Sequence, residues 1–184
     1  TALSLDANTQ VTILTPEDAY LYAKGQPLYL QPYNPDRTST RVSKLNKPLD
    51  FAAVTDHAEL LGEVRMCTDS NSQYFNNLTC KLYRNFPRLS YFYVNAKASL
   101  GKSLSMCGAN RDLCLAEAQI PWSQTIEAAE RHYDRTEECK FTSFIGYEWT
   151  GAVYSGSNLH RNIIFKNSNV PFAPVSFLDA PSRQ

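Results

Sequence analysis

The residues best suited to chemistry in this sequence stand where short apolar runs end. The first run covers residues 49–54 and is followed directly by Thr55, Asp56 and His57. A run of this length fits a buried strand and is too short for a helix. Ligands of parallel α/β sheets bind at the carboxyl ends of the strands, so an aspartate–histidine pair there is well placed for chemistry. The alternative is structural: Asp56 caps the next helix, and His57 is only its hydrogen-bonded neighbour.

Two later segments also carry polar groups at the ends of predicted strands. Residues 141–150, FTSFIGYEWT, predict a second strand that ends in the carboxylate of Glu148 between aromatic side chains. After a turn that contains Gly151 and Gly156, residues 158–165 predict a third strand, with His160 near its beginning. Helices are predicted before these strands, from Thr15 to Gly25 and again from Pro121. This alternation of helices and strands favours an α/β fold with a parallel component.

Composition and charge limit the classes of partner. The 184 residues are enough for one domain, and 43% of them are hydrophobic, which is enough for a substantial core. Eighteen basic residues balance eighteen acidic ones, so nothing favours binding to nucleic acid. The sequence contains no apolar run of the length that a membrane span needs.

The five cysteines bear on the compartment of the protein. Cys67 and Cys80 bracket one polar segment, Cys107 and Cys114 bracket another, and Cys139 stands apart. None has the CxxC spacing of a structural zinc site. The simplest interpretation is two local disulfides with Cys139 left over, which indicates a periplasmic or extracellular protein. Five reduced cysteines are the alternative. Residues 63–116, which hold four of the cysteines, are interpreted as a mainly helical insertion.

Four motifs, TPEDAY, KPLDFAAVTDHAELLG, FTSFIGYEWT and NLHRNIIF, occur in this order. Together they resemble the DUF3604 family, a branch of the polymerase-and-histidinol-phosphatase (PHP) superfamily of metal-dependent phosphoesterases. The resemblance implies a distorted (β/α)7 barrel with two or three divalent metal ions at the carboxyl ends of its strands. Members of the family are usually longer than this chain and often exported. Residues 1–184 are therefore expected to form a single, partial PHP-like domain with the insertion inside it.

The resemblance also implies roles for individual residues. Asp6, His57, Glu148 and His160 match metal ligands of the superfamily, with Glu148 as the carboxylate that bridges two ions. Asp56 is expected to orient its neighbours without binding metal itself. The His-x-His pair that opens the superfamily's site, and its later ligands, have no counterpart here. The chain is thus expected to be an internal fragment that carries about half of the site and is inactive alone.

The function implied by this resemblance is hydrolysis of a small-molecule ester, a phosphoric or related ester, with Zn, Mn or Fe as the metal. Arg161, next to His160, is a candidate for binding a phosphate through two hydrogen bonds. The alternative, slightly favoured, places it on the opposite face of the strand from His160. The alternative function is a noncatalytic structural or binding protein that keeps the barrel without the reaction.

Overall fold

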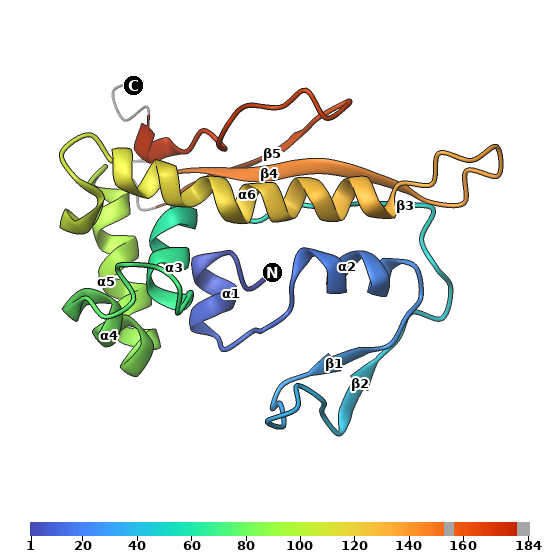
Figure 1. Ribbon diagram of the computed structural model, residues 1–184, viewed down its shortest axis with the longest axis horizontal. Helices are drawn as coiled ribbons and strands as arrows, with labels where there is room; N and C mark the ends of the chain where they lie inside the picture. The colour runs from blue at the N-terminus through green and yellow to red at the C-terminus, as the bar shows by residue number, and fades with distance from the viewer. Residues whose placement is uncertain (153–156, 180–184) are drawn as a thin grey trace.

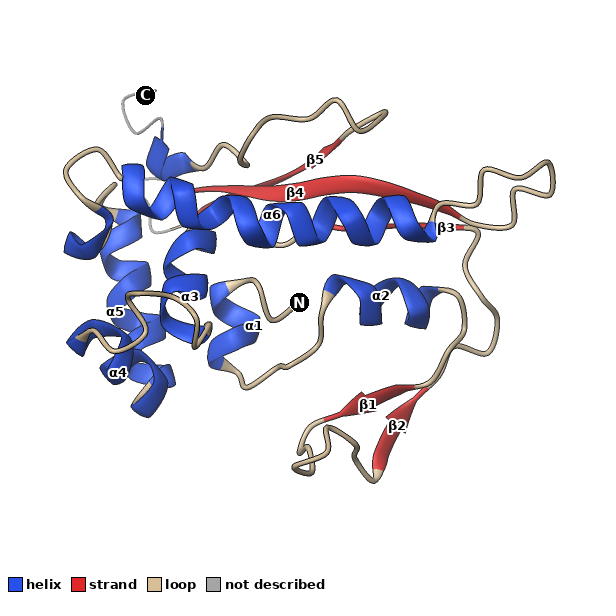
Figure 2. Ribbon diagram, viewed as in Figure 1, coloured by secondary structure: helices blue, strands red, loops and turns tan. Residues whose placement is uncertain are grey.

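A mixed three-stranded sheet in the order β3–β4–β5 organises the fold (Figure 1, Figure 2). The computed structural model describes residues 1–152 and 157–179. Strand β3 (Phe51–Val54) runs parallel to β4 (Thr142–Ala152), and β5 (Asn158–Ile164) runs antiparallel to β4. The three predicted strands and the parallel component are therefore confirmed. The predicted turn at Gly156 lies outside the described residues.

The long helix α6 (Asp112–His132) covers one face of this sheet and runs along β4 (Figure 1). Its buried Trp122 meets the ring of Tyr147 edge-on, at a centroid distance of 5.8 Å. The prediction that a helix begins at Pro121 is wrong, because α6 starts nine residues earlier and continues through the proline. Proline cannot donate the backbone hydrogen bond of a helix interior, which destabilises α6 at Pro121. Buried Ala118 and Trp122 lie on either side of it, and their packing stabilises the helix enough to continue through the proline.

Helix α2 (Pro16–Ala23) confirms the other helix prediction. The Thr15 hydroxyl accepts a hydrogen bond from the backbone N–H of Asp18, and the Asp18 carboxylate accepts one from the backbone N–H of Thr15. This capping box is encoded within four residues, which is why it can be recognised in the sequence. A small antiparallel hairpin of β1 (Leu28–Leu30) and β2 (Arg41–Ser43) follows.

The remaining helices gather at one end of the sheet, on the left in Figure 1. They are α1 (Leu5–Thr9), α3 (Leu61–Thr68), α4 (Leu78–Asn85) and α5 (Pro87–Ser99), with short 3-10 turns at Ser105–Cys107 (η1) and Phe177–Asp179 (η2). Two disulfides, Cys67–Cys80 and Cys107–Cys114, lie among them and confirm the predicted pairing. Cys139 is free and exposed. Residues 63–116 are mainly helical, and their status as an insertion stays a prediction.

The predicted (β/α)7 barrel is wrong. The described residues form two small sheets of two and three strands, and these strands do not close into a barrel. A barrel of this kind needs successive parallel strands joined by helical crossovers of a dozen or more residues. The connection between Ala152 and Asn158 is too short for such a crossover, so β5 returns antiparallel to β4. Among the described helices, none combines the length and the apolar composition of a membrane span.

Candidate metal site

The parallel pairing of β3 with β4 places His57 beside Glu148. The regular ladder between β3 and β4 ends at Val54 and Ile145. Three residues further along each strand, an isolated parallel bridge joins His57 to Glu148. The Glu148 N–H donates to the carbonyl of Asp56 at 2.9 Å, and the Ala58 N–H donates to the carbonyl of Glu148 at 2.8 Å. Backbone hydrogen bonds thus hold the histidine and the glutamate at neighbouring positions of the sheet.

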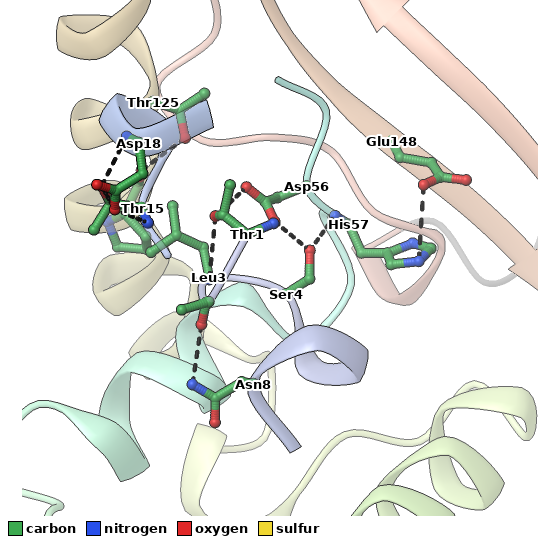
Figure 3. A network of polar contacts seen from close by, with 12 residues as sticks. Thr1, Leu3, Ser4, Asn8, Thr15, Asp18, Asp56, His57, Thr125 and Glu148 are labelled. Carbon is green, nitrogen blue, oxygen red and sulfur yellow. Dashed lines mark hydrogen bonds and ion pairs between the residues drawn. The ribbon is translucent and has the colours of Figure 1, made fainter. Parts of the chain in front are cut away.

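The antiparallel pairing of β4 with β5 adds His160 to this pair. His160 lies opposite Thr150 in the ladder, and its Nδ1 is 2.8 Å from Glu148 Oε1. The other carboxylate oxygen of Glu148, Oε2, is 3.8 Å from His57 Nε2, the contact drawn in Figure 3. One ligand atom from each of His57, Glu148 and His160 lies within 4.8 Å of the others. Three of the four predicted metal ligands are therefore brought together.

The fourth predicted ligand, Asp6, lies on the same cavity as this cluster but outside the group of three. The cavity has a volume of about 480 Å³, and Asp6, His57, Glu59, Thr150 and His160 line it. Asp6 comes from α1 and is exposed. Arg161 is not among the described residues that line the cavity, and it follows His160 directly in β5, where consecutive side chains point to opposite faces. Its phosphate-binding role stays a prediction.

Asp56 is buried and bonded to the beginning of the chain. Its carboxylate accepts hydrogen bonds from the hydroxyls of Thr1, at 2.7 Å, and Ser4, at 2.6 Å (Figure 3). The Ser4 hydroxyl oxygen in turn accepts a hydrogen bond from the backbone N–H of His57, at 3.0 Å. Asp56 does not cap α3, whose N-cap residue is Leu60 and has no side-chain capping bond. Asp56 is thus connected to the backbone of His57 through Ser4, and its orienting role at a metal site stays a prediction.

Sequence reasoning missed two residues that contact the histidines. The hydroxyl of Thr150 is 2.9 Å from Nδ1 of both His57 and His160. Glu59 is buried, and its Oε1 accepts hydrogen bonds from the backbone N–H groups of Thr150, at 3.1 Å, and Phe177, at 3.2 Å. Its other oxygen, Oε2, is 3.8 Å from His57 Nδ1. Thr150 is two residues after Glu148 on the same face of β4, and that spacing was the available signal.

The carboxylates around His57 set its protonation. The interaction with Glu59 raises the pKa of His57 above its ordinary value, against the effect of burial, and the charges of Glu148 and Asp6 raise it further. The negative surrounding therefore stabilises the protonated imidazole more than water does. The same surrounding, with Glu59 buried, Glu148 partly accessible and Asp6 exposed, favours any cation that takes the place of this proton.

The fold and the site together define a small α/β protein with an imidazole–carboxylate cluster at one end of a mixed sheet. The chain belongs to the DUF3604 family, described as a protein family of unknown function, and the family model matches residues 1–184. The resemblance expected from the four motifs is thereby confirmed at the level of this family. No curated protein and no solved structure matches the chain.

Proposed function

We propose that His57, Glu148 and His160 bind a divalent metal ion and that the protein is a hydrolase of phosphoric or related esters. The observation that carries the proposal is the meeting of two imidazoles and one carboxylate within 4.8 Å of one another, with both imidazoles lining a cavity of about 480 Å³. Three protein ligands with an open side are typical of catalytic rather than structural sites.

The residues present fit such an ion in chemistry and in spacing. Imidazole and carboxylate are ligands for Zn, Mn and Fe. Ligand atoms that share one tetrahedral ion at normal bond lengths are roughly 3.4 Å apart. The Glu148 oxygens stand 2.8 Å from His160 Nδ1 and 3.8 Å from His57 Nε2, so small side-chain rotations suffice. Thr150 contacts Nδ1 of His57, whereas Nε2 of the same ring faces Glu148, so its hydroxyl would hold this ring in place, as hydrogen-bonding partners of metal ligands do.

An ion held there would supply Lewis-acid chemistry for ester hydrolysis. The residues of the chain would bind and orient the substrate. Tyr91 and Asn95 from α5, and Asn158 from β5, line the cavity and offer hydrogen bonds to a small-molecule ester. Asp6 lines the same cavity and would approach a second ion, and this part of the proposal includes PHP superfamily membership and a site of two or three ions. The two disulfides support a periplasmic or extracellular location.

The test combines metal analysis with Glu148→Gln, which keeps the shape of the side chain and removes its charge. We expect the wild type, produced with any sequence that flanks residues 1–184 in the native protein, to bind Zn²⁺ or Mn²⁺ and to hydrolyse a chromogenic phosphoester. The variant should bind the ion at least about 100-fold more weakly. Glu127→Gln, on the exposed side of α6, is the matched control and should leave both properties unchanged.

Two results would contradict the proposal in different ways. A wild-type protein that binds neither ion would remove the metal site. Metal binding that depends on Glu148, without turnover of mono- or diesters of phosphate, would favour the noncatalytic binding protein that is the alternative function.

A further inference from the structure

A buried ion cluster lies behind the candidate metal site. Arg111 stands between two carboxylates, with its Nη2 3.4 Å from Glu63 Oε1 and its Nε 3.4 Å from Asp179 Oδ1. The contact with Asp179 is an ion pair without a hydrogen bond. The exposed fraction is 3% for Glu63 and 9% for Arg111. Burial raises the pKa of Glu63, and the charge of Arg111 opposes that shift. Removing one member of such a cluster leaves an uncompensated buried charge, so the arrangement strongly constrains the segments that it joins.

Arg111 reaches the cluster from a short loop whose shape is fixed covalently. The Cys107–Cys114 disulfide closes this loop, and Arg111 immediately precedes α6 in the left-handed conformation, with φ of 62°. A left-handed conformation is unfavourable for arginine and persists only where the surroundings determine it. The loop therefore presents the guanidinium at a fixed place.

Asp179 connects Arg111 to the segment 176–179. Its Oδ2 accepts hydrogen bonds from the backbone N–H of Ser176, at 2.8 Å, and from the Ser176 hydroxyl, at 2.7 Å. The carboxylate thus closes a turn on itself through one oxygen while its other oxygen faces Arg111. Phe177 lies inside this turn.

Phe177 connects the turn to the metal site. Its backbone N–H donates to Glu59 Oε1 at 3.2 Å, its ring meets Trp149 edge-on at 6.3 Å, and it lines the cavity of the site. Glu59 Oε2, which faces His57 Nδ1 at 3.8 Å, is buried without a hydrogen bond of its own. The position of Glu59 behind His57 is therefore set in part by where Phe177 lies.

We propose that Arg111 is a positioning residue for the candidate metal site. It anchors the segment 176–179 through Asp179, and the segment holds Glu59 against His57 through the N–H of Phe177. The claim that this segment positions a metal-binding histidine rests on the proposed function. The claim that Arg111 anchors the segment does not. Loss of the anchor should free the Phe177 N–H, release one hydrogen bond on Glu59 and leave the ring of His57 less well oriented for an ion.

The experiment compares Arg111→Met with Arg65→Met. Arg65 is a matched control, because it is also largely buried and paired with two carboxylates, those of Asp69 and Glu117. These partners lie directly after α3 and on α6, outside the segment 176–179. Hydrogen exchange of the Phe177 amide reports the anchoring, and the Zn²⁺ dissociation constant reports the positioning. For Arg111→Met we expect exchange at least about 10-fold faster and Zn²⁺ binding about 10-fold weaker, and no change in either for Arg65→Met.

Asp179→Asn tests the same link from the other end. This variant leaves the Glu63–Arg111 pair in place, so the test does not depend on whether Arg111→Met folds. We expect faster exchange of the Phe177 amide and weaker Zn²⁺ binding, both by smaller factors than in Arg111→Met. Unchanged exchange at Phe177 in these variants would overturn the anchoring. Faster exchange with unaltered Zn²⁺ affinity would overturn the positioning. If the wild type binds no Zn²⁺, the proposed function fails instead, while exchange at Phe177 still decides whether Arg111 anchors the segment.

Discussion

Replacing Gly62 with alanine tests the close packing of α3 against α6. A Cβ atom at Gly62 would lie 1.9 Å from the carbonyl oxygen of Cys114 and 3.1 Å from the backbone nitrogen of Ala118, both in α6. Ordinary contact begins at 3.4 Å, so α3 and α6 must separate by 3.4 − 1.9 = 1.5 Å along this direction. Backbone atoms of a helix cannot rotate away as a flexible side chain does.

The expected change in the free energy of unfolding combines two opposing effects. Overpacking typically destabilises by about 1–3 kcal/mol, and a clash with backbone belongs at about 3 kcal/mol. Alanine is better than glycine inside a helix by about 1 kcal/mol, which offsets part of this. The net destabilisation is therefore about 2 kcal/mol, or a fall in Tm of about 4–8 °C for a chain of this size.

Thermal unfolding followed by circular dichroism measures this difference. Ser123→Ala, on the exposed side of α6, is the control, because it changes helix propensity without a new contact and should stabilise slightly. A Gly62→Ala protein as stable as the wild type, or more stable, would show that α3 and α6 do not approach as closely as described.

Four further outcomes are expected. Thr150→Val should weaken Zn²⁺ binding about 10–100-fold, because it removes the hydroxyl that contacts Nδ1 of His57, whereas Thr150→Ser should retain most of the affinity; equal affinities of Thr150→Val and the wild type in calorimetric titration would contradict this. Affinity for Zn²⁺ should rise with pH and level off above the raised pKa of His57, because the proton and the ion compete for the ring; affinity that stays flat between about pH 5.5 and about pH 8 would count against His57 as a ligand. Without metal, the raised pKa of His57 means that protonated His57 stabilises the folded protein at pH below the pKa of this residue in the unfolded chain. This contribution to stability is lost as the pH rises through the pKa of His57 in the folded protein. Thiol titration of denatured, unreduced protein should find one free cysteine, Cys139; five would contradict both disulfides.

The features that were predicted correctly are those with local signals. The capping box that begins α2 lies within residues 15–18, and the two disulfides each close a short loop, of 13 and 7 residues in sequence separation. The strands follow apolar runs, and the polar groups at their ends are visible in the sequence as breaks in those runs. His57 and Glu148 were found for that reason.

The features that were missed depend on contacts between distant residues. In the sequence, Glu59 is an acidic residue shortly after the TDH motif, with no local signal of a role. Only the fold brings the N–H groups of Thr150 and Phe177, which donate to its carboxylate, close to it. Pro121 signals a helix start locally, but the packing of α6 on both sides of it carries the helix through. The barrel was expected from family resemblance alone, and no periodicity in the sequence bears on whether a sheet closes.

The pairing of β3 with β4 also has a consequence for the order of folding. It joins Phe51 to Thr142 and Val54 to Ile145, residues that lie on either side of most of the helices. Closing so long a loop has an entropic cost that contacts within a helix avoid, and topologies rich in such pairings fold slowly. We therefore expect His57 and Glu148 to become neighbours only after the helical segments between them have formed. A refolding experiment that follows metal binding should detect the site later than circular dichroism detects helix.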